Sequence, residues 1–327
     1  MFLAPDDATE FLMSGKVIAL PTETVYGLAA IATNPSAVAR IFEIKKRPQD
    51  NPLICHFHSI DQIKKYVTNI PAATEKLINH FSPGPISFMF DLPGDSPLKF
   101  ATCGSGQLVA RIPDHPLFLN IIKKTNLPIA APSANTSGKV SPTSPAMVLL
   151  DLDGRIDGIV DGGRCSVGLE STIVDARNDD EIFILRQGTI GADELQIILP
   201  KSKITAAAET GENVIPGTKY RHYAPNTPII LVEKLTEVDK NSALLLTEEA
   251  FRNLSHEWIG NLSDANVQIV LLGSIENIND FASKFYEKIS SVDLLNVSTA
   301  FFLRTEFGNS SLGKALQERI EKITGAS

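Results

Sequence analysis

The sequence predicts an α/β protein in which a twisted mixed sheet flanked by helices precedes a smaller α/β unit. Short apolar runs alternate with amphipathic helical patterns along the first 200 residues, and a similar alternation begins again after a polar stretch. Several neighbouring runs are separated only by Pro and Gly turns. Because such turns are too short for a crossover helix, we expect antiparallel as well as parallel pairs and therefore a mixed sheet.

Apolar periodicity predicts the individual elements of the first part. Strands are predicted at 17–20, 53–57, 86–90, 107–112, 128–131, 156–160, 171–174 and 182–185. Helices are predicted at 36–46, 61–67, 72–81, 116–125 and 192–199. We assign residues 1–200 to one domain.

Residues 201–225 have little periodicity, and we interpret them as a linker. Beyond the linker, residues 226–327 are predicted to form a small Rossmann-like α/β domain. Its predicted elements are apolar strands within 228–233, 243–250 and 267–274, and helices at 280–290 and 312–324. No Gly-rich dinucleotide fingerprint follows its first strand.

Composition excludes several classes of protein. A chain of 327 residues, 43% of them hydrophobic, can bury a full core. Its net charge of -8 argues against a protein that coats nucleic acid non-specifically. Three widely spaced cysteines without a CxxC motif fit reduced thiols in the cytoplasm. The N-terminal residues lack the positive charge of a signal peptide, and no run approaches a membrane span, so we expect a cytoplasmic location and no membrane partner.

Polar residues occur where two predicted strands begin or end. Thr22, Glu23 and Thr24 stand between two apolar segments, and Ser171 lies beside a second apolar strand. A buried hydroxyl or carboxylate without a partner costs on the order of 1–3 kcal/mol. These side chains therefore require a partner, which is either protein or ligand.

Cationic residues form a second group of candidates. Lys45 and Arg47 lie at the end of a predicted helix. Their charges either complement the negative end of the helix dipole or bind a polyphosphate, and the sequence does not decide between these roles. Arg111 lies among apolar residues at a strand end and needs a carboxylate, from an internal ion pair or from a ligand. Arg186 ends another strand.

The loop after the strand at 128–131 is rich in hydroxyl and amide side chains, which include Ser133, Asn135 and Ser141. Such exits from α/β sheets bind nucleotides, although a plain surface loop is an alternative. A Walker A loop is excluded because Val140, and not Ser or Thr, follows Lys139.

The end of the linker combines aromatic and basic residues. They are Lys219, Tyr220, Arg221, His222 and Tyr223. This segment is either solvated or folds back as a lid that closes a site.

Taken in order, several motifs resemble the YrdC-like domain of the threonylcarbamoyl-AMP synthase family. They are PTETVYGL, KKRPQDNPL, SPGPISF, VARIPDHP, PIAAPSAN, GLESTIVD and LRQG. The segment PGTKYRHYAP and the α/β unit after it are similar to the long, two-domain form of that family. The motifs cover the first 225 residues, and the remainder agrees by position and pattern. One departure is CHFH, where many members have apolar residues around a single histidine.

The resemblance implies a nucleotidyltransferase reaction. L-Threonine, bicarbonate and ATP give threonylcarbamoyl-AMP, pyrophosphate and water, with Mg²⁺ accompanying ATP and no tightly bound organic cofactor. The product passes to a threonylcarbamoyl transferase complex that modifies the tRNA adenosine next to the anticodon, so tRNA is an indirect partner. No covalent enzyme intermediate is required.

The resemblance also implies roles for individual residues. The residues implied for L-threonine are Thr22, His56, Arg111, Ala131 and Ser171. Those implied for ATP are Lys45, Arg47, Ser133, Asn135, Ser141, Arg186 and Tyr223. Lys45, Arg47 and Arg111 are the catalytic candidates, and no residue is predicted to ligate a metal. On this interpretation the ligand supplies the hydrogen-bond partners that Thr22 and Thr24 require and that the fold does not.

Two alternatives compete with this interpretation. A non-catalytic module that binds tRNA or double-stranded RNA is supported by the cluster at 45–47 and the basic linker, but the acidic total and the lack of an aromatic stacking platform oppose it. A relative that handles carbamoyl groups with ATP in metalloenzyme maturation would carry zinc-finger and acylphosphatase-like segments, which the sequence does not show.

Overall fold

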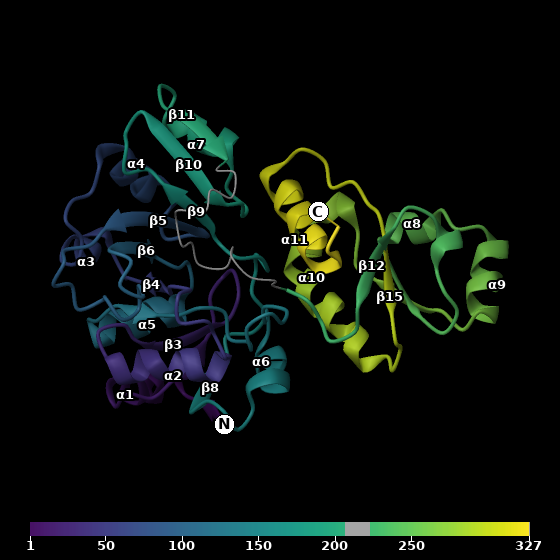
Figure 1. The fold of residues 1–327 in the computed structure, drawn as a ribbon, viewed down its shortest axis with the longest axis horizontal. Coiled ribbons are helices and arrows are strands. Elements are labelled where there is room, and N and C mark those ends of the chain that lie inside the picture. Colours follow the sequence, from purple (N-terminus) through teal and green to yellow (C-terminus); the bar gives the residue numbers. More distant parts are fainter. Residues whose placement is uncertain (207–222, 327) are drawn as a thin grey trace. The chain divides into compact units, whose positions relative to one another are not determined.

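The structure is a computed structural model that describes residues 1–206 and 223–326. The described residues group into two compact units, one formed by 1–137 and 142–206, the other by 138–141 and 223–326. Each unit is built around its own sheet (Figure 1). The remaining linker residues, among them Lys219, Tyr220, Arg221 and His222 of the predicted lid, lie outside the described residues.

The first unit contains an eleven-stranded mixed sheet. Its strands are β1 (Phe2–Leu3), β2 (Ile18–Leu20), β3 (Gly27–Ile31), β4 (Ile54–His56), β5 (Ile86–Asp91), β6 (Gln107–Arg111), β7 (Ile129–Ala130), β8 (Gly158–Val160), β9 (Thr172–Asp175), β10 (Glu181–Arg186) and β11 (Lys203–Ala206). Their order is β1-β8-β2-β3-β7-β4-β6-β5-β9-β10-β11. Strand β4 pairs parallel with β6 and antiparallel with β7, which confirms the predicted mixed sheet.

Seven α-helices lie in the described part of the first unit. They are α1 (Pro5–Met13), α2 (Pro35–Lys45), α3 (Ile60–Lys64), α4 (Ala72–Phe81), α5 (Pro116–Thr125), α6 (Pro145–Leu152) and α7 (Ala192–Ile198). Helix α2 begins at Pro35 behind Asn34, whose side chain accepts hydrogen bonds from two backbone N–H groups, and it ends where Lys46 adopts a φ of 51°. These two local signals place Lys45 in the last turn.

The core lies on both faces of the sheet. In β2, Ala19 packs into one buried apolar cluster, whereas Ile18 and Leu20 pack into another. In β3, Leu28 belongs to the first of these clusters and Ala29 to the second. Alternate side chains of one strand therefore point to opposite, equally buried faces, as expected for a sheet covered on both sides.

Some elements of the first unit are not among the predicted ones. Strand β3 has the sequence Gly-Leu-Ala-Ala-Ile, in which Gly and Ala are weak strand formers, and its pairing with β2 and β7 defines it. Strand β11 lies inside the predicted linker and pairs parallel with β10. Its mostly exposed side chains explain the absence of an apolar pattern.

The second unit contains a four-stranded sheet in the order β12-β15-β13-β14, and all its pairs are parallel. The strands are β12 (Ile229–Val232), β13 (Ala243–Leu246), β14 (Gln268–Leu271) and β15 (Ala300–Leu303). The helices are α8 (Glu248–Arg252), α9 (His256–Asp264), α10 (Ile278–Ser291) and α11 (Ser311–Thr324), with 3-10 turns at Leu235–Glu237, Ile275–Asn277 and Val292–Leu294. The predicted second α/β domain is confirmed. Among the described residues, no helix has the length and apolar character needed to cross a membrane.

Candidate active site

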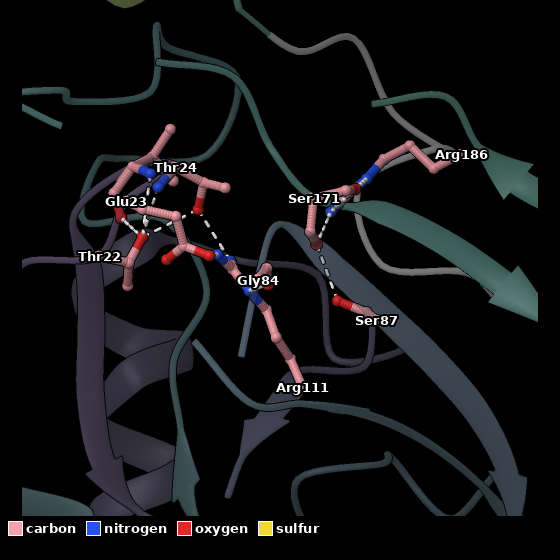
Figure 2. Close-up of polar contacts among 9 residues, drawn as sticks. Thr22, Glu23, Thr24, Gly84, Ser87, Arg111, Ser171 and Arg186 are labelled. Atoms are coloured by element: carbon pink, nitrogen blue, oxygen red, sulfur yellow. Dashed lines mark hydrogen bonds and ion pairs between the residues drawn. The ribbon is translucent and has the colours of Figure 1, made fainter. Parts of the chain in front are cut away.

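Arg111, the last residue of β6, is 4% exposed and lies at the centre of a polar cluster (Figure 2). Its guanidinium Nη1 donates to Thr24 Oγ1 at 2.8 Å, and its Nε donates to the Gly84 carbonyl at 3.2 Å. The third nitrogen, Nη2, lies 2.6 Å from Glu23 Oε1. The internal ion pair considered from the sequence is therefore present.

The contact between Arg111 and Glu23 is an ion pair without hydrogen-bond geometry. Neither carboxylate oxygen of Glu23, nor Nη2 of Arg111, makes a hydrogen bond with any residue that the structure describes. Both side chains are nearly buried, at 5% and 6% exposure. The pair is held by charge, and its donor and acceptor atoms keep the capacity to bind a polar ligand.

Thr22 and Thr24 form a local hydroxyl network ahead of β3. Thr22 Oγ1 donates to the Val25 carbonyl at 2.7 Å, lies 2.8 Å from Thr24 Oγ1, and accepts from the backbone N–H groups of Thr24 and Val25 at 3.1 Å. The expectation that only a ligand supplies partners for these hydroxyls is therefore wrong. The side chains close their own turn first, as Thr commonly does.

Ser171 lies on the other side of Arg111. Ser87 of β5 is the cross-strand neighbour of Arg111, and its Oγ lies 2.8 Å from Ser171 Oγ. Arg186, at the end of β10, donates from Nη2 to Ser171 Oγ at 3.1 Å and to the Ser171 carbonyl at 2.9 Å. Hydrogen bonds thus join Ser87 to Ser171 and Ser171 to Arg186. Because Ser87 is paired in register with Arg111, this group lies beside the guanidinium (Figure 2).

His56 ends β4 and is paired in register with Arg111 across the β4–β6 ladder. Its ring is 3% exposed and stacks on Phe118, with centroids 5.1 Å apart. Burial and the positive charge of Arg111 lower the pKa of His56 to about 3, so the imidazole is neutral. Among the described residues, His56 Nδ1 has no hydrogen-bond partner.

Lys45 organises a second group of predicted residues. Its side chain is buried, and Nζ donates to the carbonyl oxygens of Ser133 and Asn135, each at 2.6 Å. The loop at 133–137 lies beside the start of β3, where Ser133 forms a β-bridge with Gly27. Burial, with the charges of Arg47 and Arg155, lowers the pKa of Lys45 well below its usual value, whereas Asp151 opposes this shift.

Arg47, Ala131 and Ser141 each make separate contacts or lie in a separate part of the fold. Arg47 donates from Nε to the Asn51 carbonyl and from Nη2 to Asn51 Oδ1 and the Pro52 carbonyl, which fixes the loop after α2. The Ala131 N–H donates to the Ile54 carbonyl at 3.0 Å. Ser141 is 2% exposed and groups with the second unit.

Tyr223 packs inside the second unit. It is 4% exposed, has a φ of 70°, stacks on Tyr286 at 5.6 Å, and lies under the Arg319 guanidinium at 5.1 Å from its ring centroid. Its role toward ATP stays a prediction.

Sequence reasoning missed Ser87, and it singled out Glu23 and Thr24 as polar residues in need of partners without assigning either to a substrate. The signal for Ser87 was available, because a single serine interrupts the apolar strand Ile86–Asp91. A buried hydroxyl inside such a strand needs a partner, and here that partner is Ser171.

Comparison with known proteins identifies the family. The family model described as "Telomere recombination" matches residues 10–188, and that described as "Threonylcarbamoyl-AMP synthase, C-terminal domain" matches residues 190–325. The chain belongs to the threonylcarbamoyl-AMP synthase family. The members with curated names are enzymes, and the alternative of a non-catalytic RNA-binding module is not favoured.

Two relatives of this family match over nearly their full length. The threonylcarbamoyl-AMP synthase of Bacillus subtilis is 34% identical, over 97% of this chain and 92% of its own, and that of Pyrococcus abyssi is 35% identical, over 97% and 93%. The solved structure of P. abyssi Sua5 complexed with L-threonine superposes with a TM-score of 0.82 at 31% identity, covering 98% of this chain and 94% of that chain.

Proposed function

We propose that this chain is an L-threonylcarbamoyladenylate synthase, which converts L-threonine, bicarbonate and ATP into threonylcarbamoyl-AMP, pyrophosphate and water. The observation that carries the proposal is the buried polar cluster around Arg111 in a member of the synthase family. Its Glu23 pairing and its unused hydrogen-bond capacity support a role in binding a small zwitterion.

The groups around Arg111 are assigned to L-threonine. The guanidinium faces the substrate carboxylate, and Glu23 holds it in place from the other side. His56 is neutral and can exchange a hydrogen bond with the threonine hydroxyl or amine through Nδ1. Thr22 and Ser171 line the two flanks of this position, and the main chain at Ala131 assists.

Lys45 and the remaining predicted residues are assigned to ATP. Lys45, Arg47 and Arg186 provide positive charge for the phosphates, and Ser133, Asn135 and Ser141 provide polar contacts. Phosphate oxygens near Lys45 favour its protonated form and thereby reverse the shift that burial causes. Tyr223 is assigned as a further contact with ATP.

Mg²⁺ enters this site as part of the MgATP substrate. Among the residues that the structure describes, no group of three or more His, Cys, Asp or Glu side chains could hold a metal ion. A magnesium ion held by substrate phosphates and water does not need such a group.

The reaction proceeds in two steps. Bicarbonate takes up a proton and loses water to give carbon dioxide. The threonine amine attacks the carbon of this carbon dioxide, and the nitrogen then loses a proton to give a carbamate. A carbamate oxygen then attacks the α-phosphorus of ATP, and the bond to pyrophosphate breaks. The protein contributes orientation, positive charge opposite the developing phosphate charge, and exclusion of water that would hydrolyse the carbamate or the anhydride. The product passes to a threonylcarbamoyl transferase complex that acts on tRNA.

Incubation of the chain with ATP, Mg²⁺, bicarbonate and each of several amino acids tests the proposal. We expect pyrophosphate and an acyl-adenylate, detected by mass spectrometry, only when threonine and bicarbonate are both present. Pyrophosphate release that is independent of either one contradicts the proposed function, and equal turnover with serine contradicts the assigned threonine pocket.

A further inference from the structure

A second polar network, beside that of Lys45, holds the 133–137 loop at Thr136. The backbone N–H and Oγ1 of Thr136 both donate to the Asp151 carboxylate, at 2.6 and 3.0 Å. Arg155 Nη1 donates to Thr136 Oγ1 at 2.9 Å and to the Asp151 carbonyl at 3.3 Å. Arg155 Nη2 also donates to the Ile44 carbonyl at the end of α2. One guanidinium therefore connects the end of α2, the loop and the end of α6.

The two networks act on the same short segment. The Lys45 carbonyl accepts from the Ser137 N–H at 2.8 Å, and Lys45 Nζ donates to the Ser133 and Asn135 carbonyls. The loop is thus fixed at its beginning and end by Lys45, and in its middle by the Asp151 and Arg155 side chains acting on Thr136. Each of these contacts restrains the backbone that supplies the two carbonyl oxygens at the buried ammonium.

The charges around Lys45 also support a role for Asp151 and Arg155 in holding this loop. Lys45 is buried near two further cations, Arg47 and Arg155, and Asp151 is the carboxylate that offsets them. Replacement of Asp151 by a neutral residue removes this offset at the Lys45 ammonium. A polyanionic ligand would relieve the repulsion between Lys45 and the two arginines, but only where the loop keeps the ammonium in place.

We propose that Asp151 and Arg155 are positioning residues for ATP, which hold the 133–137 loop and the Lys45 ammonium in the geometry that receives the triphosphate. The inference rests on the proposed function, because it assumes that this loop binds ATP. Asp151 and Arg155 act through Thr136 and Lys45 and do not touch the substrate themselves.

The same helix offers a matched control. Arg40, one turn and a half before the end of α2, donates from Nη1 to Asp157 Oδ2 at 2.8 Å, and Asp157 also accepts from the Val17 N–H. This is again an arginine joined to an aspartate that fixes a backbone N–H, but it contacts neither the loop nor Lys45 in any described interaction. The variant Arg40→Met therefore measures the structural cost of losing such a pair.

The test compares Arg155→Met, Asp151→Asn and Thr136→Val with wild type and with Arg40→Met. Pyrophosphate release gives kcat and the separate KM values for ATP and threonine, and thermal unfolding gives Tm. We expect the KM for ATP to rise at least tenfold in Arg155→Met and Asp151→Asn and at least threefold in Thr136→Val, while the KM for threonine stays within twofold. Arg155→Lys should recover part of the loss, and Arg40→Met should lower Tm without changing either KM.

Several results would overturn the inference. They are a KM for ATP within twofold of wild type in Arg155→Met and Asp151→Asn, a parallel rise in the KM for threonine, and an equal effect of Arg40→Met. Thr136→Val removes only a hydroxyl, so it decides the matter if the charged variants do not fold. A wild-type chain without threonine-dependent pyrophosphate release refutes the proposed function instead. Calorimetric titration of the same variants with ATP then tests the positioning role by itself.

Discussion

The two units of this protein treat buried charge differently. In the first unit, buried charged side chains gather near the ends of the strands and in the loops beside them, and they include Glu23, Lys45, Arg47, Arg111, Glu170 and Arg186. Among residues 223–326 of the second unit, Arg319 is the buried charged side chain. Because burial of a charge is costly unless it is paired, the repeated burial in the first unit indicates a function that requires it.

The partners of Arg111 and Arg319 sharpen this contrast. Arg111 pairs with Glu23, whose side chain is 6% exposed. Arg319 Nη1 lies 3.2 Å from Oε1 of Glu318, whose side chain is 32% exposed. Loss of Arg111 leaves the buried Glu23 carboxylate without this counter-charge. After loss of Arg319, the Glu318 carboxylate still pairs with Lys322 at 2.6 Å and is partly exposed to water. We therefore expect the same substitution to have different consequences in the two units.

The largest effect is expected from Arg111→Met. It should lower the free energy of unfolding by about 3–5 kcal/mol, because the Glu23 carboxylate becomes a buried, uncompensated charge. It should also raise the KM for threonine by roughly 10- to 150-fold, the range for a lost charge-assisted hydrogen bond of about 1.5–3 kcal/mol. Urea unfolding and pyrophosphate release measure the two effects.

The double variant Glu23→Gln with Arg111→Met is the control for this prediction. It should recover part of the lost stability, because the buried carboxylate is removed, but none of the threonine affinity. A normal KM for threonine in Arg111→Met would remove Arg111 from the assigned role.

A smaller effect is expected from Arg319→Met. The cation–π contact with Tyr223 is lost, but the methionine chain preserves much of the packing, so the free energy of unfolding should fall by about 2 kcal/mol or less. The KM for threonine should not change. A loss as large as that of Arg111→Met would show that Arg111 and Arg319 are equivalent and would break the comparison.

His56 should make stability depend on pH. Its pKa is lowered to about 3 in the folded chain from 6.5, so between these values the unfolded chain binds a proton that the folded chain does not. Stability should therefore fall as the pH drops below 6.5, by about 1 kcal/mol at pH 5.5 for this group alone. Urea unfolding at pH 7 and 5.5 measures the difference, which His56→Gln should reduce and the change of the exposed His80 to Gln should not. An unchanged pH dependence in His56→Gln would contradict the predicted neutral state.

The smallest effect is expected from Ser87→Ala. Ser171 keeps its hydrogen bond from Arg186, so only one buried hydroxyl contact is lost, at about 0.5–1 kcal/mol. We expect a two- to fivefold rise in the KM for threonine, because Ser171 is less firmly oriented. A KM identical to that of wild type would show that Arg186 alone positions Ser171.

Local patterns in the sequence determined most of the fold. The apolar runs at 86–90 and 107–112 appear as β5 and β6, and the start and stop signals of α2 place Lys45 at its end. These patterns predict helices and strands because apolar periodicity and helix-capping residues depend only on neighbours a few positions away in the sequence. Strand β3 was missed because its small side chains carry no local signal, and its neighbours alone define it.

The tertiary structure decided which of the predicted site residues meet. Strands β4, β6, β5 and β9 come from distant parts of the chain. Their order and register bring four side chains together at the same end of these strands, namely His56, Arg111, Ser87 and Ser171. The strand order β2-β3-β7-β4-β6 brings the segment between β2 and β3 to Arg111 and so provides its partner Glu23, a choice the sequence left open. Strand order and register depend on contacts between segments far apart in the sequence, so no local pattern contains them.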